Sequence, residues 1–462
     1  MPSSDQGASS LLKFMLSDLR FHIRLWLPAF VSAGLGAACA GGVIIAVSSG
    51  LHTAEPAPVN DALEGVRVLG GTVSLLTLTA TSGVVGSTAG FILTSQAPNH
   101  ARLLFIGFTP KQLKRMLRAE IACLVLFAAA AAIPLSYAAA TVILWQWAAI
   151  GIVASGQLPV AAYWHPYAIL LLVVLAAVWG TWGPTRRASK IPAATALREA
   201  STHKPHIAWV RSGLAVMLFV GGTAILLAVS LLPLGGSDDR AAGALSGLLL
   251  LIVATLLVPL WTIRPLLWGW TALVFSQSAP WFLAREACRF AASRTLATVV
   301  PFAIASSLLA VLYGGGAISG GGTSLTEIGV LLGPTIVVAW GGGICIIALI
   351  GQSRARERRL LIAAGASRKL LLQTVCLEGI IYAITALLYE ALFLSATILV
   401  LSSVSDISLS SALHELPWSA FLVISLATIG LAIGTALISI HQPVQNARDE
   451  KPRSTNTQGE YS

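Results

Sequence analysis

Ten apolar stretches of membrane-spanning length constrain this chain more than any other feature of its sequence. They lie at 26–48, 70–95, 119–145, 165–184, 211–233, 243–263, 295–317, 328–352, 376–402 and 418–441. A helix needs about 20 apolar residues to cross the hydrocarbon of a bilayer, where the backbone must satisfy its own hydrogen bonds. The chain has 462 residues, of which 56% are hydrophobic and 10% charged, too apolar a composition for a soluble protein. The sequence therefore predicts an all-α, polytopic membrane protein.

The basic residues predict how the chain is oriented. With the amino terminus in the cytoplasm, all 29 Lys and Arg residues except Arg67 and Arg240 fall on the cytoplasmic side, as the positive-inside rule requires. Both termini are then cytoplasmic, and the net charge of +10 needs no nucleic-acid partner. The apolar stretch 264–284 is interrupted by Pro265 and Pro280. We predict that it lies at the membrane interface, because an eleventh span would invert every later loop.

Several kinds of chemistry have no matching pattern in the sequence. The five cysteines lie in spans or on the cytoplasmic side, and the histidines show no metal-ligand spacing. No G-x-x-x-x-G-K-[ST] motif occurs, so we do not expect this chain to hold ATP in a P-loop. The glycine-rich stretch 314–323 lacks the lysine of a phosphate cradle and is expected to form a flexible outer loop. We therefore expect no catalytic residue, no metal and no cofactor in this chain.

Two distant stretches of the sequence resemble each other. They are ARLLFIGFTPKQLKRMLRAEIA at 101–122 and RRLLIAAGASRKLLLQTVCLEG at 358–379. An offset of 258 aligns Leu103 with Leu361, Gly107 with Gly365, Thr109 with Ser367, Lys111 with Lys369, and Glu120 with Glu378. Each stretch lies between the second and third spans of a four-span unit, and self-similarity of this kind indicates an internal repeat.

The repeat predicts how the chain is divided. Residues 1–10 and 451–462 are expected to be disordered tails, 11–200 and 281–450 two four-span repeats, and 201–280 a two-span insert with the interfacial segment. Because an even number of inserted spans preserves orientation, the repeats would be parallel and related by an axis along the membrane normal.

Local sequence predicts a helix, a sharp turn and a second helix in each repeated stretch. Gly107 and Gly365 would adopt the left-handed conformation that ends a helix. Thr109 is a good N-cap, and Gln112 completes a capping box, whereas Ser367 repeats the cap without the box.

Basic residues surround both predicted turns. The first set is Arg102, Lys111, Lys114, Arg115 and Arg118, and the second is Arg356, Arg358, Arg359 and Lys369. The four cations after the first glycine share one helix face, which we expect to point into the cytoplasm. Positive-inside anchoring with contact to membrane lipids would explain the charge, but it leaves the repeated cap geometry unexplained.

Three glutamates stand out because they lie at or inside the membrane. Glu120 and Glu378 fall at the boundary of the third and ninth spans, where each could pair with a basic neighbour or reach water. Glu390 falls in the middle of the ninth span, and its counterpart Ala132 is apolar. A role in transport or gating, a hydrogen bond between helices, and a misplaced span boundary are the alternatives for Glu390.

The pattern R-L-L-x(2,3)-G-x-[ST]-x-K-x-L-x(6)-E, followed after the fourth span by PTRRASKIPAATALRE, resembles FtsX-like permeases, the membrane subunits of MacB-type ABC transporters. The resemblance covers both four-span units and is weaker at the end of the second, where QPVQNARDE lacks the proline-initiated helix of 191–198. It implies coupling helices at 98–118 and 353–372 that dock on a cytoplasmic ATPase, with Arg186 and Arg187 beside the contact. ATP and magnesium would then be bound by two copies of that partner.

The resemblance also implies a location and a function. It places the chain in a bacterial cell membrane as the permease subunit of an ATP-binding cassette transporter, itself not an enzyme. Family members usually carry a large outer domain, whereas the loops here, 49–69 and 318–327, are short. We therefore expect export of a membrane-partitioning substrate such as a lipid, hydrophobic peptide or lipophilic drug. The alternatives are ATP-driven signalling to a sensor kinase or cell-wall hydrolase, and an ion-coupled transporter that uses Glu390.

Overall fold

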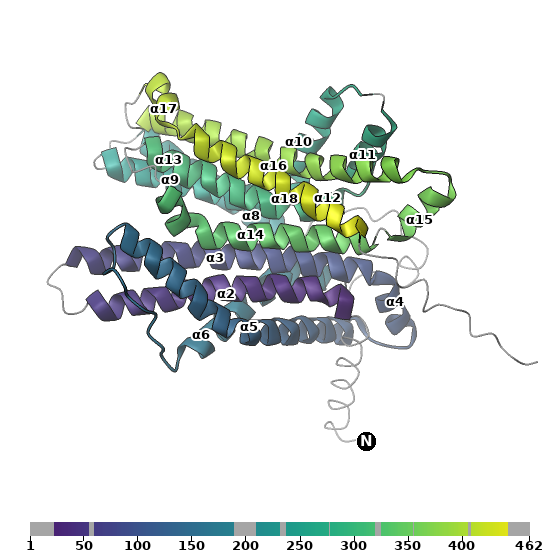
Figure 1. Ribbon diagram of the computed structural model, residues 1–462, viewed down its shortest axis with the longest axis horizontal. Coiled ribbons are helices and arrows are strands. Elements are labelled where there is room, and N and C mark those ends of the chain that lie inside the picture. Colours follow the sequence, from purple (N-terminus) through teal and green to yellow (C-terminus); the bar gives the residue numbers. More distant parts are fainter. Residues whose placement is uncertain are drawn as a thin grey trace, which may run out of the picture.

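The chain folds into a bundle of long helices (Figure 1). The computed structural model describes residues 23–54, 60–188, 209–231, 237–276, 278–318, 325–353, 355–404 and 408–441. Ten helices in this part are long and apolar enough to cross a membrane, and each overlaps one predicted span. The same residues form no strand. The prediction of an all-α, multi-pass membrane protein is confirmed.

The helices follow the predicted order. The first half contains α2 (Ile23–Ala54), α3 (Asn60–Ser95), α4 (Ala97–Phe105), α5 (Pro110–Ala149) and α6 (His165–Ala188). The middle contains α8 (Trp209–Leu231), α9 (Ser237–Leu257), α10 (Pro259–Leu273) and α11 (Ala279–Phe290). The second half contains α12 (Ala292–Leu308), the π-helix η1 (Leu309–Tyr313), α13 (Gly314–Ile318), α14 (Leu325–Ser353), α15 (Ala355–Ala363), α16 (Arg368–Val404), α17 (Leu409–Glu415) and α18 (Trp418–His441). The domain division stays a prediction, and the boundary at 200 and both predicted tails fall outside the described residues.

The stretch 264–284 is divided between two short helices. Neither α10 nor α11 is long enough to cross a membrane. Arg289 of α11 joins them, because its Nε donates to Thr271 Oγ1 at 3.1 Å and its Nη2 donates to the carbonyl of Trp268 at 3.0 Å. This arrangement requires no eleventh span.

The glycine-rich stretch 314–323 differs from its prediction. Residues 314–318 form α13, which continues η1 and α12, and Gly314 and Gly315 are buried. The expected flexible loop is therefore wrong for these residues, while 319–323 lie outside the described part. A backbone at membrane depth must form its own hydrogen bonds, and this requirement outweighs the flexibility of glycine.

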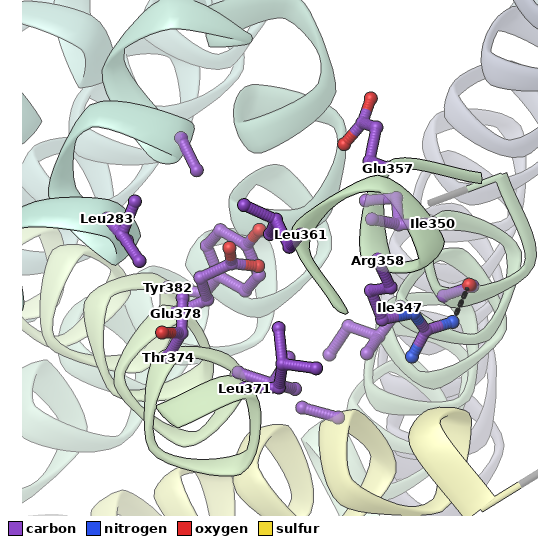
Figure 2. Close-up of a pocket in the computed structure, with 14 residues that line it drawn as sticks. Leu283, Ile347, Ile350, Glu357, Arg358, Leu361, Leu371, Thr374, Glu378 and Tyr382 are labelled. Carbon is purple, nitrogen blue, oxygen red and sulfur yellow. Dashed lines mark hydrogen bonds between the residues drawn. The ribbon is translucent and has the colours of Figure 1, made fainter. Parts of the chain in front are cut away.

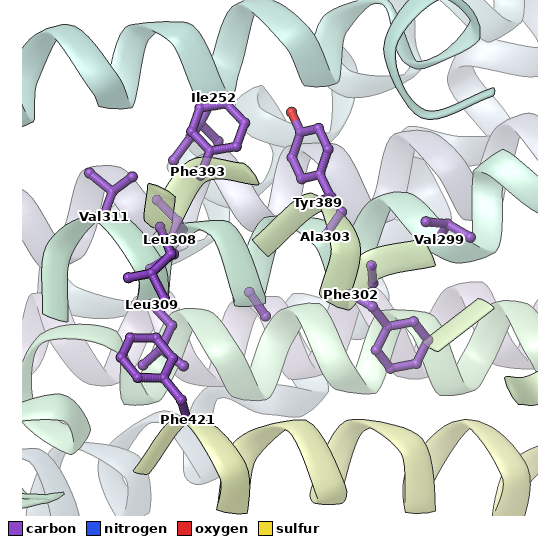
Figure 3. Close-up of a cluster of buried hydrophobic side chains, with 14 of the residues drawn as sticks. Ile252, Val299, Phe302, Ala303, Leu308, Leu309, Val311, Tyr389, Phe393 and Phe421 are labelled. Atoms are coloured by element: carbon purple, nitrogen blue, oxygen red, sulfur yellow. The ribbon is translucent and has the colours of Figure 1, made fainter. Parts of the chain in front are cut away.

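Large apolar side chains fill the second half of the bundle (Figure 3). Phe302 of α12, Leu309 of η1, Phe393 of α16 and Phe421 of α18 all belong to one buried cluster. In the most apolar part of span Arg294–Ile318, 78% of residues are buried, against 11% for Ser212–Leu231. Helix α12 is therefore central, whereas α8 lies at the edge of the bundle.

Helices α3 and α14 meet at the centre through residues that the offset of 258 makes equivalent. Thr77 Oγ1 and Thr335 Oγ1 lie 3.3 Å apart, and Val84 packs directly on Gly342. A residue on a two-fold axis contacts its own counterpart, so both contacts are those that an approximate two-fold axis between α3 and α14 would produce. Figure 1 places these helices side by side between the two halves.

Candidate functional site

The first repeated turn joins α4 to α5. Gly107 has a φ of 106° and donates to the carbonyl of Leu104 at 3.2 Å, while the N–H of Phe108 donates to the carbonyl of Leu103 at 3.1 Å. The N–H of Thr109 donates to Gln112 Oε1 at 2.9 Å, and the N–H of Gln112 donates to Thr109 Oγ1 at 3.3 Å. The predicted glycine terminus and capping box are both confirmed. We call residues 97–118 the first elbow.

The second repeated turn joins α15 to α16 with the same backbone pattern. Gly365 has a φ of 91° and donates to the carbonyl of Ile362 at 2.9 Å. The N–H of Ala366 donates to the carbonyl of Leu361 at 2.9 Å, and the N–H of Leu370 donates to Ser367 Oγ at 3.2 Å. The predicted cap by Ser367 is confirmed. We call residues 355–376 the second elbow; both elbows lie at one end of the bundle (Figure 1).

We expect the capping box to determine how firmly the first elbow is held. Thr109→Ala removes the bond that Thr109 Oγ1 accepts from the N–H of Gln112 and the bond that it donates to Gln112 Oε1, and should cost about 1 kcal/mol of local helix stability. Hydrogen exchange of the amides at 111–113 should become faster as a result. Thr141→Ala is a matched control, because Thr141 is an exposed threonine of α5 that bonds only within its own helix. Equal exchange in both variants would contradict this role.

Both elbows expose large apolar side chains at their tips. Phe105 and Ile106 are 59% and 78% exposed in the first elbow, and Leu360 and Ile362 are 65% and 57% exposed in the second. Exposed apolar residues that gather on one surface mark sites of protein–protein contact. Sequence analysis missed these residues because hydropathy alone assigns such side chains to the interior. The signal that could have found them was their position within one turn of the helix-ending glycine.

Most of the predicted cations lie on the elbow surfaces. Arg102, Lys111 and Arg115 are exposed in the first elbow and Lys114 is half-buried, whereas Arg359 and Lys369 are exposed in the second. Arg358 turns inward and donates from Nη2 to the carbonyl of Gly351. Arg186 is exposed at the end of α6, and the side chains of Arg187 and Arg356 lie outside the described part.

Arg118 does not belong to the exposed cationic face. Its guanidinium carbon lies 4.2 Å from the ring centroid of Trp182 on α6, a cation–π contact. The prediction that all four cations after Gly107 point into the cytoplasm was therefore wrong for Arg118. The aromatic face of Trp182 attracts the guanidinium inward and ties α5 to α6.

The two boundary glutamates are buried rather than exposed to water. Glu120 is 1% exposed and Glu378 is 7% exposed. The alternative in which they reach water is contradicted by this burial, whereas pairing with a basic neighbour stays a prediction. An ion pair between Arg294 and Glu357, with 3.7 Å between Nη1 and Oε1, joins the start of α12 to α15.

Glu390 lies in the middle of the continuous helix α16 and is 5% exposed. Glu390 lies well inside both ends of the candidate span Arg368–Val404, which argues against a misplaced span boundary. Ser306 Oγ donates to the carbonyl of Ala386 at 3.3 Å, and a β-carbon on Gly314 would lie 2.9 Å from Leu394 Cδ1. These contacts are one helical turn on either side of Glu390, so its carboxyl faces η1. Its Oε2 is buried without a hydrogen-bond partner among the described residues.

His165 forms a buried polar centre that sequence analysis did not single out. Ala162 donates its N–H to His165 Nδ1 at 3.3 Å, and Ser48 Oγ lies 2.8 Å from Nε2. Because Nδ1 accepts a hydrogen bond, the ring proton is on Nε2 and is donated to Ser48. The centre ties α2 to α6 at the end opposite the elbows. No group of three or more His, Cys, Asp or Glu side chains that could hold a metal occurs in the described residues.

The comparisons with known proteins concern the first half of the chain. Residues 71–193 match the family model described as FtsX-like permease C-terminal, a region that includes the first elbow. No curated protein matches the chain. The second elbow lies outside the matched region.

Proposed function

We propose that this chain, whose residues 71–193 match the FtsX-like permease model, serves as the membrane component of an ATP-binding cassette system. In this proposal a separate cytoplasmic ATPase docks on the two elbows, one ATPase subunit on each. That partner binds ATP and magnesium. The observation that carries the proposal is the pair of elbows with matching geometry at one end of the bundle.

The surface of the elbows supports docking of a protein. Each tip presents apolar side chains, Phe105 and Ile106 in one elbow and Leu360 and Ile362 in the other. Exposed cations flank both tips. An apolar centre with a charged rim is the usual anatomy of a protein interface. Positive charge around it would steer an acidic partner surface into contact.

The length of the helices supports transmission of movement from the elbows. Helix α5 has 40 residues, which corresponds to about 60 Å at 1.5 Å per residue. Helix α16 has 37 residues and also begins at its elbow. Each helix therefore extends without a break from the docking surface to the opposite side of the membrane. A tilt imposed by the ATPase would be carried to the outer ends of the bundle.

We propose that the system exports a substrate that partitions into the membrane, such as a lipid, a hydrophobic peptide or a lipophilic drug. The short connections between spans favour recognition within the bilayer. Vesicle reconstitution with the ATPase distinguishes this function from signalling to a sensor kinase. An exporter moves a labelled lipid or drug when ATP is added, whereas a signalling unit hydrolyses ATP and moves neither.

The docking proposal is tested by changing both helix-ending glycines. In Gly107→Val with Gly365→Val, an L-residue would be forced into positive φ at both turns, at about 1–2 kcal/mol each. No atom lies within 4 Å of a β-carbon at either position, so the effect would be conformational. We expect mild extraction of the wild type to recover the ATPase with the chain, and the double variant to lose it.

Gly151 and Gly156 provide the matched control. They also have positive φ and open surroundings, but they lie between α5 and α6 at the opposite end of the bundle. Gly151→Val with Gly156→Val should retain the ATPase. Recovery of no ATPase with the wild type, or equal recovery with both double variants, would contradict the proposal.

A further inference from the structure

A cavity of about 160 Å³ lies beside the second elbow (Figure 2). Its walls come from α11, α14, α15, α16 and α18. Most of the lining is apolar and includes Leu283, Ile347, Leu361 and Leu371. A dry apolar cavity of about 150 Å³ holds a molecule the size of benzene. The space therefore fits one ring or a short alkyl segment, not a whole lipid.

Three positions of the cavity wall have larger aliphatic counterparts in the first half. At the offset of 258, Gly351, Thr374 and Val375 of the cavity wall correspond to Leu93, Met116 and Leu117. These three side chains are 1%, 7% and 0% exposed. The smaller side chains at these three positions leave space that larger side chains fill in the core of the first half.

The polar groups of the cavity come from one face of α16. Thr374, Glu378 and Tyr382 follow one another at intervals of four residues, so they share a helix face. Figure 2 shows the side chains of Glu378 and Tyr382 next to each other, with Leu361 nearby. Tyr382 replaces Leu124 of the first half, which adds a phenol beside the carboxyl.

The charges around the cavity favour a cation over an anion. Two carboxyl groups, of Glu357 and Glu378, and one guanidinium, of Arg358, line it; Glu357 is paired with Arg294, and Arg358 donates to the carbonyl of Gly351. At the buried wall, a phosphate or carboxylate would meet the carboxyl group of Glu378. A protonated amine would donate hydrogen bonds to the carboxylate of Glu378, which is 7% exposed, and charge-assisted bonds of this kind are strong.

We propose that this cavity binds a lipophilic amine, a molecule with one protonated amine and an apolar ring or short chain. The amine bonds to Glu378 and Tyr382, and the apolar part packs against Leu361, Ile347 and Leu371. Leu361 belongs to α15 and Leu371 to α16, on either side of Gly365. A bound amine would therefore contact both helices of the second elbow from inside the bundle. Any effect of the bound amine on ATPase docking rests on the proposed function, whereas binding of the amine to the cavity does not.

The experiment uses the full chain in lipid nanodiscs without any ATPase. The probe is benzylamine with a photoreactive diazirine on its ring, and mass spectrometry locates the labelled peptides. We expect labelling of α15 and α16 at the cavity. Unlabelled benzylamine should compete, and benzyl alcohol, which has the same apolar part without the charge, should not.

Two variants test the site. Glu378→Gln keeps the shape of the side chain and should raise the concentration needed for half-maximal labelling about tenfold, because a hydrogen bond to a charged group is lost. Gly351→Leu, Thr374→Met and Val375→Leu together restore the side chains of the first half and should abolish labelling. Glu390→Gln, which changes the other buried carboxyl of α16, should leave labelling unchanged.

The proposal is overturned by labelling elsewhere in the chain, by competition from benzyl alcohol as strong as from the amine, or by equal labelling of Glu378→Gln and the wild type. If the triple variant does not fold, Glu378→Gln still decides the question. Because the labelling experiment contains no ATPase, its failure would not count against docking of an ATPase on the elbows. A failure of the docking test would likewise not count against amine binding.

Discussion

Gly86→Val should prevent the first half of the bundle from packing, and folded protein should be lost on extraction. A β-carbon on Gly86 would lie 2.6 Å from the carbonyl oxygen of Gly180, and one on Gly180 would lie even closer to the carbonyl of Ser82. Helices α3 and α6 thus meet backbone to backbone. A side-chain rotation cannot relieve this overlap, so the cost should exceed the usual 1–3 kcal/mol of about one extra buried methylene.

The measurement is the fraction of chain that elutes as a monodisperse peak after detergent extraction. Gly71→Val is the matched control, because Gly71 lies on the same helix and nothing lies within 4 Å of a β-carbon there. The control should express and elute like the wild type. A well-folded Gly86→Val protein would show that α3 and α6 can separate without loss of the fold.

Glu390→Leu should stabilise the bundle and impair ATP-driven activity. The buried Oε2 has no hydrogen-bond partner among the described residues, and an unsatisfied buried polar atom costs about 1–3 kcal/mol. A leucine of similar size removes that cost within the apolar cluster that surrounds α16. We therefore expect a higher midpoint of thermal unfolding, together with lower substrate movement in vesicles that contain the ATPase.

The physical reason for the expected loss of substrate movement is that the carboxyl of Glu390 faces η1. A π-helical turn disturbs the regular hydrogen-bond ladder and often marks a functional site. The ionisable residue that faces this turn is Glu390. Ser395→Ala, an exposed change on the same helix, should alter neither quantity. If Glu390→Leu were both more stable and fully active, a transport or gating role for this carboxyl would be excluded.

The features that could be predicted from the sequence are those set by neighbouring residues. Ten spans follow from hydropathy, and the turn at Gly107 follows from a glycine and a cap within a few positions. The span predicted at 119–145 is shorter than α5, which begins at Pro110, because hydropathy does not count the amphipathic turns of an elbow. Helix ends near charged residues are therefore the least predictable part of the fold.

The features that could not be predicted depend on residues far apart in the chain. Arg118 was assigned to the outer face because its spacing fits, yet the contact that turns it inward comes from Trp182. The cavity beside the second elbow needs walls from five helices. In the sequence, the cavity is indicated only by a comparison of the two repeats, in which Gly351 stands where the first has Leu93. The burial of Glu120 and Glu378 likewise follows from packing and not from their place at a span boundary.

The contact between Val84 and Gly342 at the central interface has a consequence for how such a bundle can evolve. In a dimer of identical chains, every substitution on the symmetry axis appears twice, so a bulky residue there must oppose itself. Within one polypeptide the two positions can change independently. Here the branched side chain of Val84 fills the space left by Gly342. Two identical chains could not place different residues at these two equivalent positions.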